Sequence, residues 1–285
     1  MLKRFKTVAI FVVIFIFTIN ITSFAQYEVD KKTKDPNAEF NWPRGIKAAV
    51  SLSFDDARLS QVDIGIPVLD KYDVKATFYV SIPSLEKRVE KWKKAAANGH
   101  EIGNHSLKHA CSGNFEFSRS RALENYTLDK MESEIDEAGR TIEKLLGVKT
   151  ATFAYPCGQS FVGRGKNLKS YVPSIAERFI AGRGWMNEWH NSPVFCDLAK
   201  VFGMPMDGHD FTYIKELIER AAKNNGWLVL AGHEMKSSGT GLTTYTSMLE
   251  ELCEYANDPA NGIWIATVKD VAEYIIEQRK AMEKK

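Results

Sequence analysis

The chain has 285 residues, of which 44% are hydrophobic and 26% are charged. This apolar content is enough for one sizeable core, and the length favours one main domain over two small ones. Lys and Arg number 38 against 36 Asp and Glu, so the formal net charge of +2 provides no broad positive surface. Nucleic acid is therefore excluded as an expected partner.

Residues 1–25 have the pattern of a signal peptide. Three basic residues among the first six precede an apolar run over residues 8–21, and small residues lead to a cleavage site after Ala25. An uncleaved membrane anchor is the alternative, although the run is shorter than the ~20 residues that a span needs. We predict removal of this segment, export to the periplasm or the medium, and no stable membrane insertion after cleavage. The polar residues 26–43 are then a linker.

Residues 44–282 alternate between short apolar runs rich in β-formers and segments with apolar residues at helical spacing. The expected strands cover residues 48–54, 76–80, 150–155, 178–181, 201–205, 227–231 and 263–266, and the expected helices cover residues 61–72, 85–98, 121–146, 211–224, 242–256 and 268–279. This alternation predicts one α/β domain with a parallel sheet, either a barrel or a doubly wound sheet. Both arrangements gather functional residues at the carboxyl ends of the strands.

Asp55 and Asp56 stand where the first buried strand ends, after Ser53 and Phe54. Two adjacent carboxylates are costly at such a place unless a cation or hydrogen bonds hold them. Neighbouring residues of an extended chain point in opposite directions, so one carboxylate can face a metal and the other a substrate water. The alternative is an ordinary Asp-Asp turn or a helix N-cap.

Three of the six histidines lie within residues 100–109. His105 and His109 are four residues apart, which on a helical turn places both imidazoles on one face and suits a shared divalent ion. Two solvated surface histidines are the alternative. His100 directly follows Asn98 and Gly99, and we assign it to the structure at the entrance of a strand.

Two further strand ends carry candidate catalytic groups. In residues 153–158 a β run is broken at Pro156, so that the backbone N–H of Cys157 could face a developing oxyanion. His233 follows the apolar run 227–231 and could protonate a leaving group, because its pKa lies near the working pH. The alternatives are a plain strand-to-loop junction and a structural histidine.

The four cysteines of an exported chain could form disulfides in any of three pairings, and the sequence does not choose among them. They are Cys111, Cys157, Cys196 and Cys253. In a chain of this length the competing interpretation is small buried side chains with at most one bridge.

Taken together and in this order, these motifs resemble those of the polysaccharide deacetylase family, the carbohydrate esterases with a NodB homology domain, over about residues 42–274. The resemblance implies a distorted (β/α)7 barrel. It also implies that Asp56, His105 and His109 bind a divalent metal, zinc in the first place with cobalt or nickel as alternatives, and that Asp55 is the catalytic base. A metal with three N/O ligands keeps a position open for water, which agrees with this assignment.

The chain departs from the family pattern in the third motif. An Arg that orients the catalytic Asp is common there, but this chain has Ala154, and Arg183 after a later strand is our candidate replacement. An ordinary surface arginine is the alternative. The usual Tyr after the Pro is Cys157. The fourth motif has no match that we assign.

The resemblance implies a metal-dependent hydrolase that removes N- or O-linked acetyl groups from a polysaccharide or cell-wall glycan, with Asp55, His233, Cys157 and Arg183 as catalytic residues. An acetylated glycan is then the partner. A catalytically silent carbohydrate-binding barrel and a hydrolase of small-molecule amide C–N bonds are the alternatives. The sequence predicts neither a particular glycan nor an oligomeric state.

Overall fold

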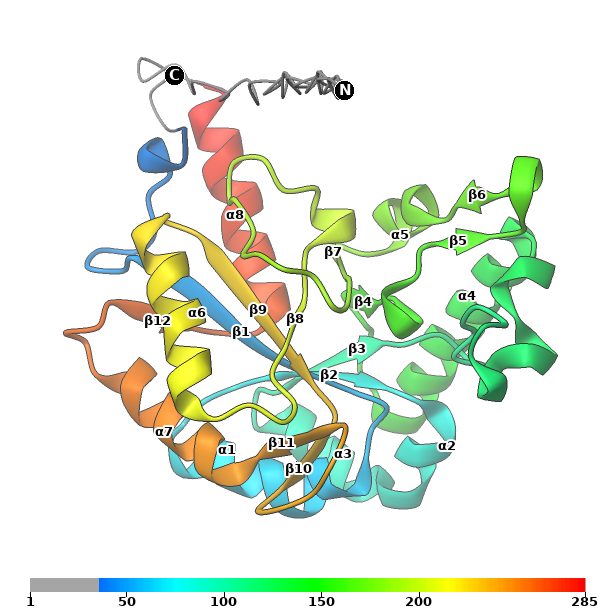
Figure 1. Ribbon diagram of the computed structural model, residues 1–285, viewed down its shortest axis with the longest axis horizontal. Helices are drawn as coiled ribbons and strands as arrows, with labels where there is room; N and C mark the ends of the chain where they lie inside the picture. The colour runs from blue at the N-terminus through cyan, green and yellow to red at the C-terminus, as the bar shows by residue number, and fades with distance from the viewer. Residues whose placement is uncertain (1–35, 285) are drawn as a thin grey trace, which may run out of the picture. The chain divides into compact units, whose positions relative to one another are not determined.

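A curled parallel sheet forms the centre of the computed structural model, which describes residues 36–284 (Figure 1). Its strands are β1 (Ala48–Asp55), β2 (Thr77–Val80), β3 (Glu101–Asn104), β4 (Thr152–Ala154), β7 (Ala181–Arg183), β8 (Met204–Pro205), β9 (Trp227–Gly232) and β12 (Ile263–Ile265). Seven of them follow the order β7-β4-β3-β2-β1-β9-β8, and β12 pairs with the first half of β1. A parallel bridge from Arg183 to Val201 brings the two edges together. The predicted α/β fold with a distorted barrel is confirmed.

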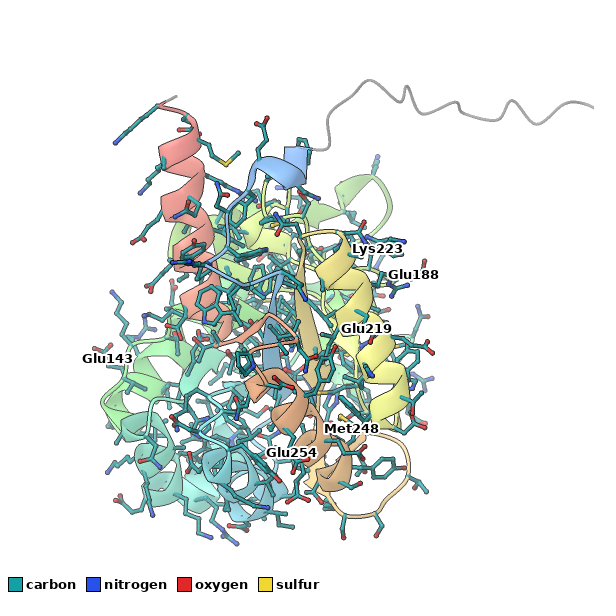
Figure 2. The ribbon with its side chains drawn as sticks, turned by 90° about the vertical axis from the view of Figure 1, so that its left-hand side faces the viewer. Glu143, Glu188, Glu219, Lys223, Met248 and Glu254 are labelled. Atoms are coloured by element: carbon teal, nitrogen blue, oxygen red, sulfur yellow. A yellow bond between two sulfur atoms is a disulfide. The ribbon has the colours of Figure 1, made fainter. Side chains whose placement is uncertain are left out.

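Helices cover the outside of this sheet. They are α1 (Ile66–Lys71), α2 (Ile82–Leu85), α3 (Val89–Ala97), α4 (Leu128–Leu146), α5 (Val172–Arg178), α6 (Phe211–Lys223), α7 (Thr246–Asn257) and α8 (Val268–Met282). Two short pairs lie outside the main sheet, β5 (Phe161–Val162) with β6 (Lys169–Ser170) and β10 (Glu234–Lys236) with β11 (Thr243–Tyr245). Figure 2 shows charged side chains such as Glu219 of α6 and Glu254 of α7, which are exposed, whereas Met248 of α7 is buried.

The alternation of β1 explains how a carboxylate comes to face the interior. Ala48, Val50, Leu52 and Phe54 pack into the hydrophobic core shared with the helices. The intervening residues point to the opposite face because side chains alternate along a strand. There the Ser53 hydroxyl donates a hydrogen bond of 2.8 Å to a backbone carbonyl of β9. Asp55, two residues further on, is therefore directed to the same inner face.

Several predicted element boundaries are wrong. The strand predicted over residues 178–181 begins at Ala181, since Arg178 ends α5, and β3 was not predicted. Its sequence, Glu-Ile-Gly-Asn, lacks the apolar content of a buried strand. Its buried Glu101 accepts hydrogen bonds from Thr77 and Thr152, which makes burial of the carboxyl group tolerable.

Two aromatic residues of the predicted linker pack against the domain. Phe40 and Trp42 are buried, and the Trp42 ring stacks on Tyr274 of α8 with centroids 5.9 Å apart. The predicted start of the domain at residue 44 stays a prediction. The predicted signal peptide lies outside the described residues. Within residues 36–284, no helix is long and apolar enough to cross a membrane.

Candidate active site

A cavity of about 570 Å³ opens at the carboxyl ends of the strands. Its wall includes the predicted residues Asp55, Asp56, His109, Cys157 and His233. Parallel strands end at one edge of their sheet, so residues distant in sequence meet there. The position of this cavity is therefore the one that the strand order predicts for a functional site.

The segment that carries His105 and His109 is a loop after β3, so the predicted helical turn is wrong. The loop is held by side chains: the Ser106 N–H donates to Asn104 Oδ1 at 2.8 Å, and the His109 N–H donates to Ser106 Oγ at 3.1 Å. Ser106 has φ 60° and His109 has φ 49°, values in the left-handed region that cost non-glycine residues free energy. The two imidazoles thus come together through a tight, hydrogen-bonded turn.

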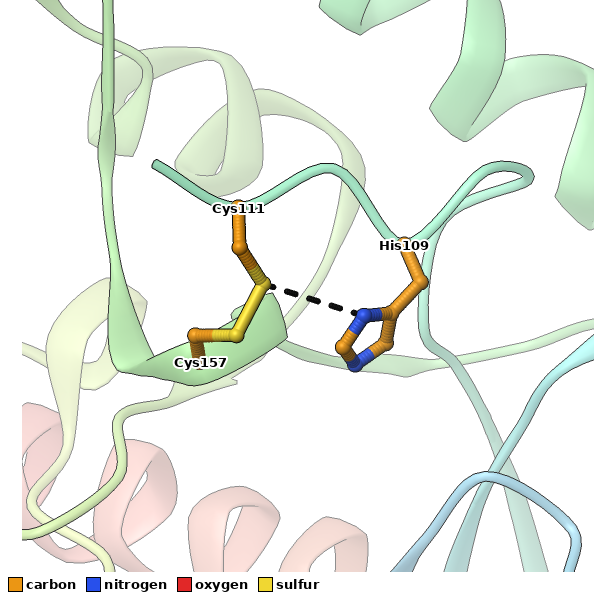
Figure 3. Close-up of side chains that lie close together, drawn as sticks. All are labelled: His109, Cys111 and Cys157. Atoms are coloured by element: carbon orange, nitrogen blue, oxygen red, sulfur yellow. Dashed lines mark hydrogen bonds between the residues drawn. A yellow bond between two sulfur atoms is a disulfide. The ribbon is translucent and has the colours of Figure 1, made fainter. Parts of the chain in front are cut away.

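The loops after β3 and β4 are joined covalently, because Cys111 and Cys157 form a disulfide (Figure 3). Cys196 and Cys253 are free, so the chain has one of the bridges that the sequence left open. The sulfur of Cys111 lies 3.7 Å from Nδ1 of His109. Cys157, in the 3-10 turn Pro156–Gly158, has φ 54° and lines the cavity.

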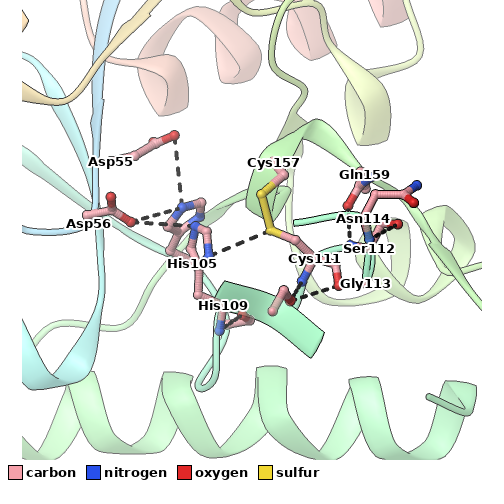
Figure 4. Close-up of a disulfide and its surroundings, with 12 residues drawn as sticks. Asp55, Asp56, His105, His109, Cys111, Ser112, Gly113, Asn114, Cys157 and Gln159 are labelled. Atoms are coloured by element: carbon pink, nitrogen blue, oxygen red, sulfur yellow. Dashed lines mark hydrogen bonds and ion pairs between the residues drawn. A yellow bond between two sulfur atoms is a disulfide. The ribbon is translucent and has the colours of Figure 1, made fainter. Parts of the chain in front are cut away.

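Asp56, His105 and His109 converge on one point (Figure 4). Oδ1 of Asp56 lies 3.7 Å from Nε2 of His105 and 3.6 Å from Nε2 of His109. The other oxygen, Oδ2, accepts a hydrogen bond of 2.8 Å from Arg58, which keeps Oδ1 turned toward the imidazoles. Nδ1 of His105 donates to the Ala154 carbonyl at 2.9 Å, so its Nε2 also faces Asp56.

This donor set fits a divalent cation. Distances of 3.6 and 3.7 Å are too long for hydrogen bonds. They are close to the roughly 3.4 Å that separates two ligand atoms of tetrahedral zinc with bonds of about 2.1 Å. Burial, followed by the neighbouring His105, lowers the pKa of His109 to about 4, so its imidazole is neutral at neutral pH. A neutral imidazole has the lone pair that a metal requires.

Asp55 forms a buried ion pair with Arg183. A guanidinium N–H of Arg183 donates to Oδ1 of Asp55, and the Arg183 side chain is completely buried. Burial raises the pKa of Asp55, but the charges of Arg183, His105 and His233 outweigh burial and lower this pKa to about 2. Asp55 is thus ionised throughout the neutral range. Arg183 of β7 pairs in register with Ala154 of β4, the residue that this chain has in place of the family's arginine.

His233, which follows the neighbouring strand β9, is held by Asp207. Nδ1 of His233 donates to Oδ2 of Asp207 at 2.7 Å, and the hydroxyl of Thr244 donates to Oδ1 of Asp207 at 2.6 Å. Burial lowers the pKa of His233, but the hydrogen bond to Asp207 and the charge of Asp55 outweigh burial and raise it above the ordinary value. His233 is therefore suited to carry a proton near neutral pH.

Sequence reasoning missed Asp207 and Arg58. Asp207 lies two residues after the end of β8, so the rule that led to Asp55, an acidic residue after a buried strand, could have found it. No sequence pattern marks Arg58, because its role follows from its ion pair with Asp56. The ring of Trp185 lies edge-on to His233 with centroids 5.0 Å apart and lines the cavity. His100, assigned to structure, is buried and accepts a hydrogen bond from the Ala76 N–H.

Comparison with known proteins finds similarity to one family. The family model for polysaccharide deacetylase matches residues 44–170. Gellan lyase from Bacillus sp is 26% identical over 254 residues, which are 82% of this chain and 9% of that protein. The peptidoglycan-N-acetylglucosamine deacetylase of Bacillus cereus is 34% identical over 97 residues, which are 29% of this chain and 34% of that protein. The chain thus spans about a tenth and a third of the length of these two relatives.

Solved structures share the fold. A Mycobacterium smegmatis protein assigned as a polysaccharide deacetylase superposes with a TM-score of 0.58 at 18% identity, covering 84% of this chain and 93% of that one. A variant of peptidoglycan deacetylase PdaC from Bacillus subtilis gives a TM-score of 0.51 at 18% identity, covering 82% and 94%. The resemblance predicted from the motifs is confirmed, since residues 44–170 match the model of the polysaccharide deacetylase family.

Proposed function

We propose that this chain is a metal-dependent hydrolase that removes acetyl groups from a polysaccharide or cell-wall glycan. The observation that carries the proposal is the convergence of Asp56, His105 and His109 beside Asp55 and His233 in one cavity. Three N/O ligands are typical of a catalytic zinc site, so zinc is our first choice, with cobalt or nickel as alternatives. Export through the predicted signal peptide would bring the enzyme to such a glycan.

Deacetylation adds water across the bond between the acetyl carbon and a sugar nitrogen or oxygen. A divalent ion held by Asp56, His105 and His109 would supply Lewis-acid chemistry that makes water more acidic and polarises the acetyl carbonyl. Asp55 takes the proton of the attacking water, and Arg183 holds its carboxylate in place through the buried ion pair. The hydroxide part of the water ends on the acetyl carbon, which leaves as acetate.

Two further groups stabilise the charge that develops on the acetyl oxygen and on the leaving group. The backbone N–H of Cys157 donates to the oxygen on which negative charge develops, as a dipole fixed by the turn. His233, whose protonated form the hydrogen bond to Asp207 favours, gives its proton to the departing sugar nitrogen or oxygen. Atoms balance, since one water is consumed for each acetate and each free amine or hydroxyl produced.

Acetate release tests the reaction. Wild-type protein is incubated with a panel of N- and O-acetylated glycans, with and without a chelator, beside Asp55→Asn. We expect release on at least one substrate, and a loss of about 100-fold or more with the chelator or with Asp55→Asn, because each removes a group needed in the transition state. Release that survives both treatments would refute the mechanism, and no release on any glycan would refute the proposed activity.

Metal content tests the assignment of ligands. Asp56→Ala and His105→Ala should lose the bound metal, whereas His233→Ala should keep it and lose rate, because His233 contacts Asp207 and not the converging donor atoms. Metal per chain is measured by elemental analysis after purification. Equal metal content in all three variants would contradict these roles.

A further inference from the structure

We propose that the Cys111–Cys157 disulfide positions His109 for metal binding, by accepting the N–H of its imidazole and by joining the loops after β3 and β4. Cys111 and Cys157 would then be positioning residues. This inference rests on the metal site proposed above and adds the contact that orients one of its ligands, His109.

The first argument is the tautomer of His109. Its Nδ1 lies 3.7 Å from the sulfur of Cys111 (Figure 3). Its Nε2 lies 3.6 Å from Oδ1 of Asp56. A neutral imidazole carries one N–H, and a disulfide sulfur can only accept. The contact is therefore favourable when the proton is on Nδ1, which leaves the lone pair of Nε2 facing Asp56. A free thiol could also donate its S–H to Nδ1, so it would select no tautomer.

The second argument comes from comparing the two histidines. His105 is buried, and its Nδ1 donates to a strong acceptor, the carbonyl of Ala154 at the end of β4. The His109 side chain is 24% exposed and sits on a residue with φ 49°. Fewer packing contacts hold it in place, so its orientation depends more on the contact at Nδ1. Partners of this kind typically change metal affinity by about 10- to 100-fold.

The third argument is the anchoring of the disulfide itself. Cys111 is fully buried, and Ser118 bonds both its N–H and its carbonyl, each at 2.8 Å. Cys111 lies two residues after His109, and Cys157 lies in the turn after β4, on the cavity wall. One bond thus joins the loop of a proposed ligand to the loop of the proposed oxyanion donor, as Figure 4 shows.

Cobalt titration of metal-free protein tests the proposal. Wild type is compared with the double variant Cys111→Ala/Cys157→Ala and with the matched control Cys196→Ala/Cys253→Ala, which keeps the bridge. We expect cobalt affinity to fall by about 10- to 100-fold in the first variant. The control should bind cobalt as wild type does. Near-ultraviolet circular dichroism confirms that each variant is folded.

A His109→Ala background separates positioning from general loosening. This background lacks one of the three ligands, so it binds cobalt more weakly and is titrated at higher cobalt concentrations. There, removing the disulfide should change the residual cobalt affinity by less than about twofold, because the group that it orients is gone. Equal affinity with and without the disulfide, or an equal loss in both backgrounds, would overturn the proposal. Failure of wild type to bind cobalt would instead refute the proposed metal site, and this inference with it.

A second measurement needs neither metal nor a variant. Nitrogen-15 NMR of metal-free wild type, in which the histidine nitrogens report which of them carries the proton, should find His109 with the proton on Nδ1. A proton on Nε2 would overturn the proposal even if the alanine variant does not fold.

Discussion

Asp207 shows how one side chain sets the chemistry of another. It contacts His233 through both the ring Nδ1–H, at 2.7 Å, and the backbone N–H, at 3.1 Å. The two bonds fix the ring orientation and favour the protonated imidazole, so the pKa of His233 is raised although burial alone would lower it. Proton donation by His233 then requires a pH below this raised pKa.

Asp207→Asn should therefore move the alkaline limb of the pH profile of kcat/KM to lower pH. The change removes the negative charge and weakens the hydrogen bond, so the pKa of His233 falls and its proton is lost earlier as pH rises. The measurement is kcat/KM for acetate release across the neutral range. Asp210→Asn, three residues away on the cap of α6, removes the same charge and should leave the limb in place. An unmoved limb in Asp207→Asn would contradict the assignment of His233 as proton donor.

Helix α6 supports two neighbouring strands that lead to the cavity. It packs against β1 and β9, whose ends lead to Asp55 and His233. It begins at a well-formed cap, since the carboxylate of Asp210 accepts the Tyr213 N–H at 3.0 Å. The cap satisfies one of the N–H groups that every helix leaves free at its first turn.

Asp210→Ala should lower the free energy of unfolding by about 1 kcal/mol, because the capping acceptor is lost. Urea denaturation of the folded protein measures the change. Asp210→Asn should recover most of the loss, since asparagine caps helices about as well as aspartate. Both variants should retain cobalt affinity, as neither touches the cavity. Similar stability for Ala and wild type would show that this cap does not contribute.

The disulfide also contributes to the stability of the molecule as a whole. It joins residues 46 positions apart; the Cys111 carbonyl accepts a hydrogen bond of 3.0 Å from the Leu123 N–H, and Cys157 lines the cavity. A covalent link over such a segment restricts the unfolded chain more than the folded one.

Removing the bridge with Cys111→Ala/Cys157→Ala should lower the free energy of unfolding by about 4 kcal/mol in the chain-entropy estimate. Guanidinium denaturation in a non-reducing buffer measures it. Cys196→Ala, at a free half-buried cysteine, is the control and should change stability far less. A loss below about 1 kcal/mol would show that strain or residual structure offsets the entropic gain.

Motifs at strand ends were enough to predict most of the candidate site. Asp55, Asp56 and His233 follow apolar runs, and the carboxyl ends of parallel strands meet at one edge, so their convergence follows from local patterns and the fold class alone. Arg183 was predicted as the replacement for an arginine that the family resemblance implies. Its buried contact with Asp55 agrees with that prediction, while its catalytic role stays a prediction.

Tertiary contacts were needed for the rest. The pairing of Cys111 with Cys157 depends on two loops meeting in space, which spacing along the chain does not encode. The turn at His109 has a left-handed φ that local preference disfavours, and hydrogen bonds from Ser106 and Asn104 hold the turn. Residue type and periodicity therefore determined the fold class and the candidate groups. In contrast, the distances between these groups and their protonation are set by neighbouring residues that come together only when the sheet curls.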